Sequence, residues 1–116
     1  MSAFYIMRFT GQAGVSGGTL YIGKGVVVGT DVHGGKYQGE YVEANGRMRG
    51  SVRMTVPAGG VSRSLVTGQR APGGATFDLD FDFPVDTFAN GAPQHMRGVG
   101  SNLVQIILEK IIDLPA

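Results

Sequence analysis

The chain has 116 residues, a formal net charge of +1 and no cysteine, and 42% of its residues are hydrophobic. This length predicts one domain with a modest core, and the lack of cysteine excludes disulfides, thiolate metal sites and thiol catalysis. The near-zero charge gives no long-range field that would attract nucleic acid or a membrane. No run approaches the ~20 apolar residues of a spanning helix, and the chain begins like a strand rather than a signal peptide, so we expect a cytoplasmic protein.

The first third of the chain predicts three strands. Residues 3–10 alternate loosely and are rich in aromatic and β-branched types, as are residues 19–22 and 26–30. Lys24, between two glycines, marks a turn between the last two of these strands. The stretch 18–25 nearly matches a phosphate-binding loop, but glycine replaces its final Ser/Thr, and a valine-rich strand follows where that motif needs a helix. A glycine-rich hairpin turn is the better interpretation.

The clearest prediction is a hairpin over residues 37–54. Asn45-Gly46 suits a two-residue type I′ turn, because both central positions need positive φ. The inward register that follows pairs Tyr37 with Met54, Gly39 with Val52 and Tyr41 with Gly50. A slip by one residue would expose the apolar side chains to water, so the turn and the pattern favour the same register.

The second half of the chain predicts further strands and a closed sheet. Residues 62–67 are a weaker strand, residues 76–83 alternate without a fault, and residues 94–97 are a short extended piece. The inward side chains of the second of these are Phe77, Leu79, Phe81 and Phe83. Residues 103–114 fit a helix or a strand, and their isoleucine content favours a strand. We therefore expect an all-β fold, an antiparallel up-and-down meander of about eight strands that closes into a small β-barrel.

Residues able to carry chemistry are few and scattered. His33 and His95 lie in loops without a second ligand at metal spacing, and Asp31 with His33 would need ligands from elsewhere. The aspartates of residues 76–83 share one strand face, but catalysis would need a raised pKa and a shielded cleft. The serines have no arrangement that resembles a nucleophile with its base. We therefore expect that the protein is not an enzyme and that it has no metal site and no cofactor.

Arg47, Arg49 and Arg53 share one strand face and form a candidate partner-binding surface. They could bind an acidic partner or nucleic acid, but no exposed aromatic alternates with them, as a stacking platform would require. Glu40 lies diagonal to Arg49 and Arg53, so an ion pair with Glu40 is the simpler expectation. We therefore expect no direct nucleic acid binding.

A longer pattern resembles a known family. The segments GTLYIGKGVVVGTD (residues 18–31) and GKYQGEY (residues 35–41), with the first and last strands, are similar to small barrel proteins of the GrlR type, negative regulators of type III secretion genes. The resemblance implies a lipocalin-like (calycin) β-barrel that forms homodimers and binds a transcriptional activator, or an apolar ligand. Those regulators carry a run of alternating acids where residues 42–46 here form a tight turn with one acid. The activator-binding role therefore does not transfer residue by residue.

Two functions from different classes stay open. The protein is either a non-enzymatic regulatory or interaction protein, or a carrier of one small apolar ligand. A barrel of ~8 strands is just wide enough to be filled by side chains or to hold one small ligand. Inward aromatics favour filling, whereas Gly39 and Gly50 could leave room. The candidate lumen residues are Tyr37, Gly39, Tyr41, Val52, Met54, Phe77, Leu79, Phe81 and Ile106.

The C-terminal strand carries more apolar side chains than one core can cover. A strand packed on one core buries alternate residues, which leaves Ile107 and Ile111 outward. Such a face is most simply buried against a copy of the same chain. We therefore expect a homodimer with Ile107 and Ile111 at the interface.

Overall fold

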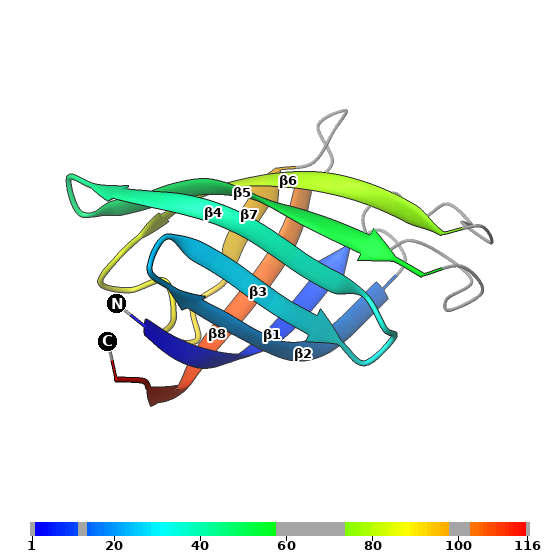
Figure 1. Cartoon of the computed structure of the whole chain (residues 1–116), viewed down its shortest axis with the longest axis horizontal. Helices are drawn as coiled ribbons and strands as arrows, with labels where there is room; N and C mark the ends of the chain where they lie inside the picture. The colour runs from blue at the N-terminus through cyan, green and yellow to red at the C-terminus, as the bar shows by residue number, and fades with distance from the viewer. Residues whose placement is uncertain (1, 12–13, 58–73, 98–102, 116) are drawn as a thin grey trace.

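The structure is a closed β-barrel. This computed structural model describes residues 2–11, 14–57, 74–97 and 103–115, and the strand predicted for residues 62–67 lies outside these ranges. The strands are β1 (Ser2–Gly11), β2 (Gly14–Gly23), β3 (Val26–Asp31), β4 (Lys36–Ala44), β5 (Arg47–Val56), β6 (Ala75–Pro84), β7 (Gln94–Arg97) and β8 (Leu103–Asp113). Each strand pairs antiparallel with the next, and β8 pairs with β1 (Figure 1). The predicted all-β meander barrel is confirmed. Among the described residues, no helix is long and apolar enough to cross a membrane.

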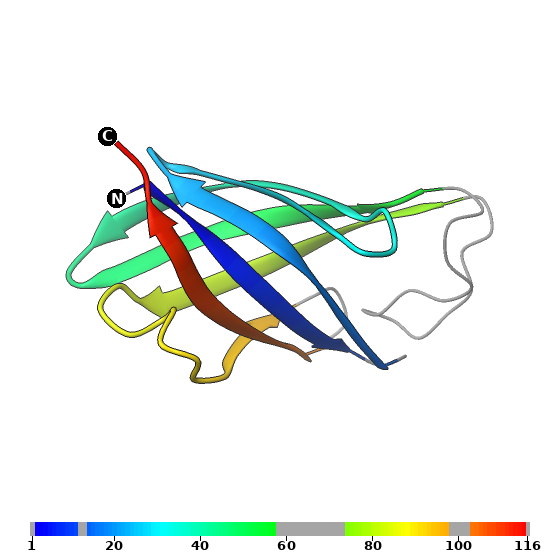
Figure 2. The same ribbon diagram turned by 90° about the horizontal axis from the view of Figure 1, so that it is seen from below.

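The first and last strands close the barrel together. β8 runs antiparallel to β1 with a β-bulge between Phe4 and Tyr5. The backbone amide of Leu114 donates to the carbonyl oxygen of Ser2 at 2.8 Å, so the two ends of the chain lie side by side (Figure 2). The C-terminal segment is therefore a strand and not a helix. Its inward side chains are Val104, Ile106 and Leu108.

The hairpin of β4 and β5 has the predicted turn and register. Asn45 and Gly46 have φ values of 55° and 76°, as a type I′ turn requires. The predicted inward pairs are all present: Tyr37 with Met54, Gly39 with Val52 and Tyr41 with Gly50. Between β2 and β3, Lys24 and Gly25 also have positive φ, at 52° and 81°. The stretch that nearly matches a phosphate-binding loop is thus the end of β2 followed by a hairpin turn.

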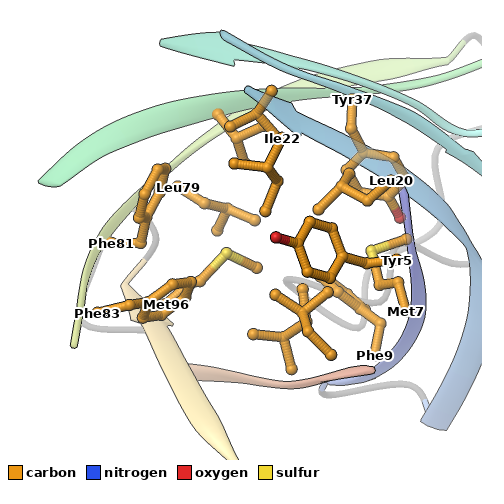
Figure 3. Close-up of a cluster of buried hydrophobic side chains, with 14 of the residues drawn as sticks. Tyr5, Met7, Phe9, Leu20, Ile22, Tyr37, Leu79, Phe81, Phe83 and Met96 are labelled. Atoms are coloured by element: carbon orange, nitrogen blue, oxygen red, sulfur yellow. The ribbon is translucent and has the colours of Figure 1, made fainter. Parts of the chain in front are cut away.

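The core fills the barrel with side chains from all eight strands of the described part. Aromatic, aliphatic and methionine side chains point to the centre from opposite walls (Figure 3). The inward side chains of β6 are Phe77, Leu79, Phe81 and Phe83, as predicted. Phe88, which lies between β6 and β7, is also buried. Its ring centroid lies 5.5 Å from that of Tyr5 and 6.4 Å from that of Phe83.

Two inward glycines let neighbouring strands approach closely. A Cβ atom on Gly39 would lie 2.2 Å from the carbonyl oxygen of Ser51, and one on Gly50 would lie 1.9 Å from that of Glu40. Real Cβ atoms essentially never come within 3.0 Å of such atoms, so a larger residue would have to move the backbone. The room that these glycines could leave for a ligand is occupied by strand backbone instead.

Candidate interaction surfaces and the barrel interior

The candidate lumen residues surround a nearly filled interior. Tyr37, Tyr41, Val52, Met54, Leu79, Phe81 and Ile106 are buried, and Gly39 and Phe77 are half-buried. The cavity among the inward side chains has a volume of about 20 Å³. One water molecule needs roughly 10–15 Å³ on this measure. The interior therefore has room for about one water molecule, and a larger ligand would have to displace side chains.

Three methionines line this small cavity. Met7 comes from β1, Met48 from β5 and Met96 from β7, so they reach the centre from different sides of the barrel. Methionine is unbranched and flexible, and it fills irregular gaps that branched side chains leave open. These residues explain how a barrel with several inward glycines still packs its centre.

The outside of the barrel carries a row of apolar side chains across four strands. Ile112 of β8 lies opposite Phe4 of β1, Phe4 lies opposite Tyr21 of β2, and Tyr21 lies opposite Val28 of β3. The rings of Phe4 and Tyr21 meet edge to face, with 5.8 Å between their centroids. Phe4 is 42% exposed, Val28 48% and Ile112 55%. The outer apolar wall consists of these four residues together with the exposed Ile6 and Ile111.

The two predicted interface residues differ in their surroundings. Ile111 is 52% exposed and belongs to the outer apolar wall. Ile107 is half-buried and lies opposite Arg8, whose guanidinium binds the carboxylate of Glu109 at 2.8 Å. The most exposed apolar part of β8 is therefore its end near Ile112, and Ile107 lies beside an ion pair.

Sequence reasoning missed the contribution of β1 to this wall, although a signal was present. Phe4 and Ile6 point outward between the inward Tyr5 and Met7, so β1 is apolar on both faces. A strand that is apolar on both faces is typical of a sheet covered on both sides. The same observation made on residues 3–10 would have predicted a covered outer face.

The arginines of β5 form ion pairs with aspartates of β6. The pairs are Arg47 with Asp82 (2.5 Å), Arg49 with Asp82 (3.0 Å) and Arg53 with Asp78 (3.0 Å). The expected pairing with Glu40 is wrong, because the aspartates stand directly opposite Arg49 and Arg53, whereas Glu40 is diagonal to them. The hydrogen bond from Arg47 lowers the pKa of Asp82. The three pairs are exposed, so they favour one register of the strands more than they stabilise the fold.

Asp31 is a buried carboxylate at the end of β3. It accepts hydrogen bonds from the Tyr37 hydroxyl at 2.5 Å and from the backbone amides of His33 and Gly35, both at 2.9 Å. Burial, together with the hydrogen bond to Asp31, raises the pKa of Tyr37. The carboxylate therefore holds the turn between β3 and β4. Across the ranges that the structure describes, no three acidic, histidine or cysteine side chains gather as a metal site would require.

Ser16 and His33 form a pair that the sequence does not reveal, because they are far apart and follow no known spacing. The Oγ of Ser16 lies 3.0 Å from the Nδ1 of His33, at the surface. Asp31 accepts from the backbone amide of His33 and not from its ring. The three residues therefore lack the arrangement of a catalytic triad, in which the carboxylate orients the imidazole.

The chain matches no protein-family model, no curated protein and no solved structure. Its own surfaces and interior are therefore the basis for a functional proposal.

Proposed function

We propose that this protein is a non-enzymatic regulatory or interaction protein that acts as a homodimer through its outer apolar wall. The observation that carries the proposal is the aligned row of Ile112, Phe4, Tyr21 and Val28 across four neighbouring strands. Contiguous exposed apolar patches on soluble domains mark interaction sites. A row on a regular sheet face suits a twofold contact, because the same residues meet on both copies.

The residues that could carry chemistry also favour a binding role. The carboxylate of Asp31 already accepts three hydrogen bonds within the β3–β4 turn. The alternative role, as a carrier of an apolar ligand, has less support, because the central cavity measures about 20 Å³. The exposed wall offers far more surface to a partner than the interior offers to a ligand.

A transcriptional activator is the further partner in this proposal, as the resemblance to GrlR-type barrels implies. Residues 42–46, which form the end of β4 and the turn into β5, have Glu43 as their single acid, so they lack the acidic run of those regulators. The surface that contacts such a partner would then lie elsewhere on the barrel. A cytoplasmic location is part of the same proposal.

Light scattering of the purified protein tests the dimer. The expected mass is about twice the chain mass of 12.2 kDa. Ile112→Asp places a charge at an exposed position near the end of β8 and should reduce the mass to that of one chain. Val42→Asp is the matched control, because Val42 is 69% exposed and lies outside the outer apolar wall. It should leave the mass unchanged.

Two results would contradict the proposal. One is a single-chain mass for the unaltered protein at high micromolar concentration. The other is an unchanged dimer mass for both Ile112→Asp and Phe4→Asp, which would place the contact elsewhere.

A further inference from the structure

The outer face of β3, β4 and β5 is hollowed into an open groove of about 590 Å³. Two cross-strand rows of outward side chains border it. The first row is Val26, Glu40 and Ser51, and the second is Val28, Gln38 and Arg53, next to Asp78 of β6. Gly39 lies between the rows, and Ser51 is small, so the floor stays low while longer side chains form the sides.

The charges in this groove do not balance. The guanidinium of Arg53 is matched by Asp78, with 3.0 Å between Nε and Oδ1. The other two arginines of this strand share the single carboxylate of Asp82 and do not line the groove. Glu40 is exposed and forms no ion pair with any residue that the structure describes. The unmatched charge in the groove is therefore negative.

An apolar border lies next to this carboxylate. Val26 stands directly opposite Glu40, and both Val26 and Val28 remain partly exposed, at 37% and 48%. Directly opposed side chains have Cβ atoms about 5 Å apart. Side chains at positions i and i+2 of an extended segment share one face and lie about 7 Å apart, so such a segment can reach both the valines and the carboxylate.

We propose that the groove binds an extended protein segment that presents a lysine or arginine next to an aliphatic side chain. The cation pairs with Glu40, and the aliphatic group packs on Val26, which lies opposite Glu40 and outside the outer apolar wall. Phosphate groups of nucleic acid or lipid would meet the unmatched carboxylate of Glu40 and be repelled, which favours a protein partner. This inference rests on the proposal that the protein acts by binding other proteins, and it names the chemistry of the partner.

Nuclear magnetic resonance titration with two short peptides tests the inference. The probe is acetyl-Val-Ser-Arg-Ser-Val-amide, in which arginine and valine are two residues apart and share one face, and its counterpart carries glutamate in place of arginine. The arginine peptide should shift the amide signals of Val28, Glu40 and Arg53 in a saturable manner, and the glutamate peptide should not. The affinity should fall in high salt, because the cation contact is exposed.

Two substitutions locate the contact. Glu40→Gln should weaken binding of the arginine peptide by about threefold, as expected for the loss of an exposed ion pair. Glu43→Gln removes a carboxylate of the same strand outside the groove and should change nothing. Ser51→Tyr, which raises the floor, should abolish the shifts.

Three results would overturn the inference. These are equal shifts with the glutamate peptide, shifts confined to β1 and β8, and no shift at millimolar arginine peptide. The masses of the same samples keep the two proposals separate. A dimer mass without peptide binding overturns the proposed binding in the groove and leaves the proposed dimer standing. Peptide binding by a single-chain species overturns the proposed dimer and leaves the proposed binding in the groove standing.

Discussion

The hydroxyl of Tyr37 donates a hydrogen bond of 2.5 Å to the buried carboxylate of Asp31. This contact ties the start of β4 to the end of β3, and the ring of Tyr37 packs near that of Phe9, with 6.2 Å between centroids. Tyr37→Phe keeps the ring but leaves a buried carboxylate oxygen without this donor. We expect the free energy of unfolding to fall by about 1–3 kcal/mol, measured by urea denaturation.

Tyr21→Phe is the matched control for that substitution. The Tyr21 hydroxyl lies 2.9 Å from the Oγ of Ser2, in a half-buried position where both groups are uncharged. Its loss should cost less than about 1 kcal/mol. Equal losses for the two variants would show that the bond to Asp31 is no stronger than an ordinary one.

Buried tyrosine hydroxyls should make the fold sensitive to alkaline pH. Burial, followed by the charges of Asp113 and Tyr41, raises the pKa of Tyr5 from 10.0 to about 12. In the unfolded chain the hydroxyl ionises near pH 10, so above that pH the folded state binds more protons than the unfolded state. Stability is therefore full below pH 10 and is lost as the pH rises from 10 towards 12.

Urea midpoints and tyrosinate absorbance across this range check that prediction. Tyr5→Phe should make the midpoint fall less steeply above pH 10, because one raised pKa is removed. The comparison between the unaltered protein and the variant is the decisive measurement. A midpoint with the same pH dependence in both would contradict a raised pKa at Tyr5.

Local patterns were sufficient to predict much of the barrel. The β4–β5 hairpin follows from Asn45-Gly46 and from alternation in the strands on either side, and both depend on near neighbours in the chain. The inward face of β6 follows in the same way from its uninterrupted alternation. The C-terminal segment was harder, because its run of isoleucines fits two periods. Its pairing with β1 makes the segment a strand, and that pairing joins residues from nearly opposite ends of the sequence.

Contacts between strands that are distant in sequence account for the misses. The sequence favours Glu40 as the partner of Arg53, because both lie in the same predicted hairpin and a meander that includes residues 62–67 does not place residues 76–83 beside residues 47–56. The strand beside β5 is β6, which brings Asp78 directly opposite Arg53. The outer apolar wall needs β8, β1, β2 and β3 side by side, and only closure of the barrel places Ile112 beside Phe4.

The β4–β5 turn should depend on a residue that tolerates positive φ. Asn45 has a φ of 55°, and alanine resists this conformation, so Asn45→Ala should lower the free energy of unfolding by about 1 kcal/mol. Asn45→Gly should keep most of the stability, because glycine adopts positive φ without steric cost. Thermal melting of the three proteins checks the order. A loss in the glycine variant as large as that in the alanine variant would show that the asparagine side chain matters for another reason.

Gly39 and Gly50, where β4 and β5 approach each other closely, should not tolerate even a methyl group. A Cβ atom on Gly50 would lie 1.9 Å from the carbonyl oxygen of Glu40 and 2.8 Å from the Cα of Tyr41, both backbone atoms held by the hairpin ladder. Gly50→Ala should therefore cost about 2–3 kcal/mol, at the upper end for overpacking a dense core, and Gly39→Ala should behave alike. Urea denaturation of each variant measures the loss.

Gly17→Ala separates the clash from the general effect of adding a methyl group. A Cβ atom on Gly17 would lie 3.3 Å from the carbonyl oxygen of Met7, a tight contact that a shift of a few tenths of an ångström relieves. This variant should lose well under half of what Gly50→Ala loses. Alanine also reduces the freedom of the unfolded chain, which by itself would stabilise both variants to a similar extent, so comparable losses at the two positions would mean that the backbone clash does not set the cost. A near-neutral Gly50→Ala would show that β4 and β5 separate readily, which the hydrogen-bonded register between Tyr41 and Gly50 argues against.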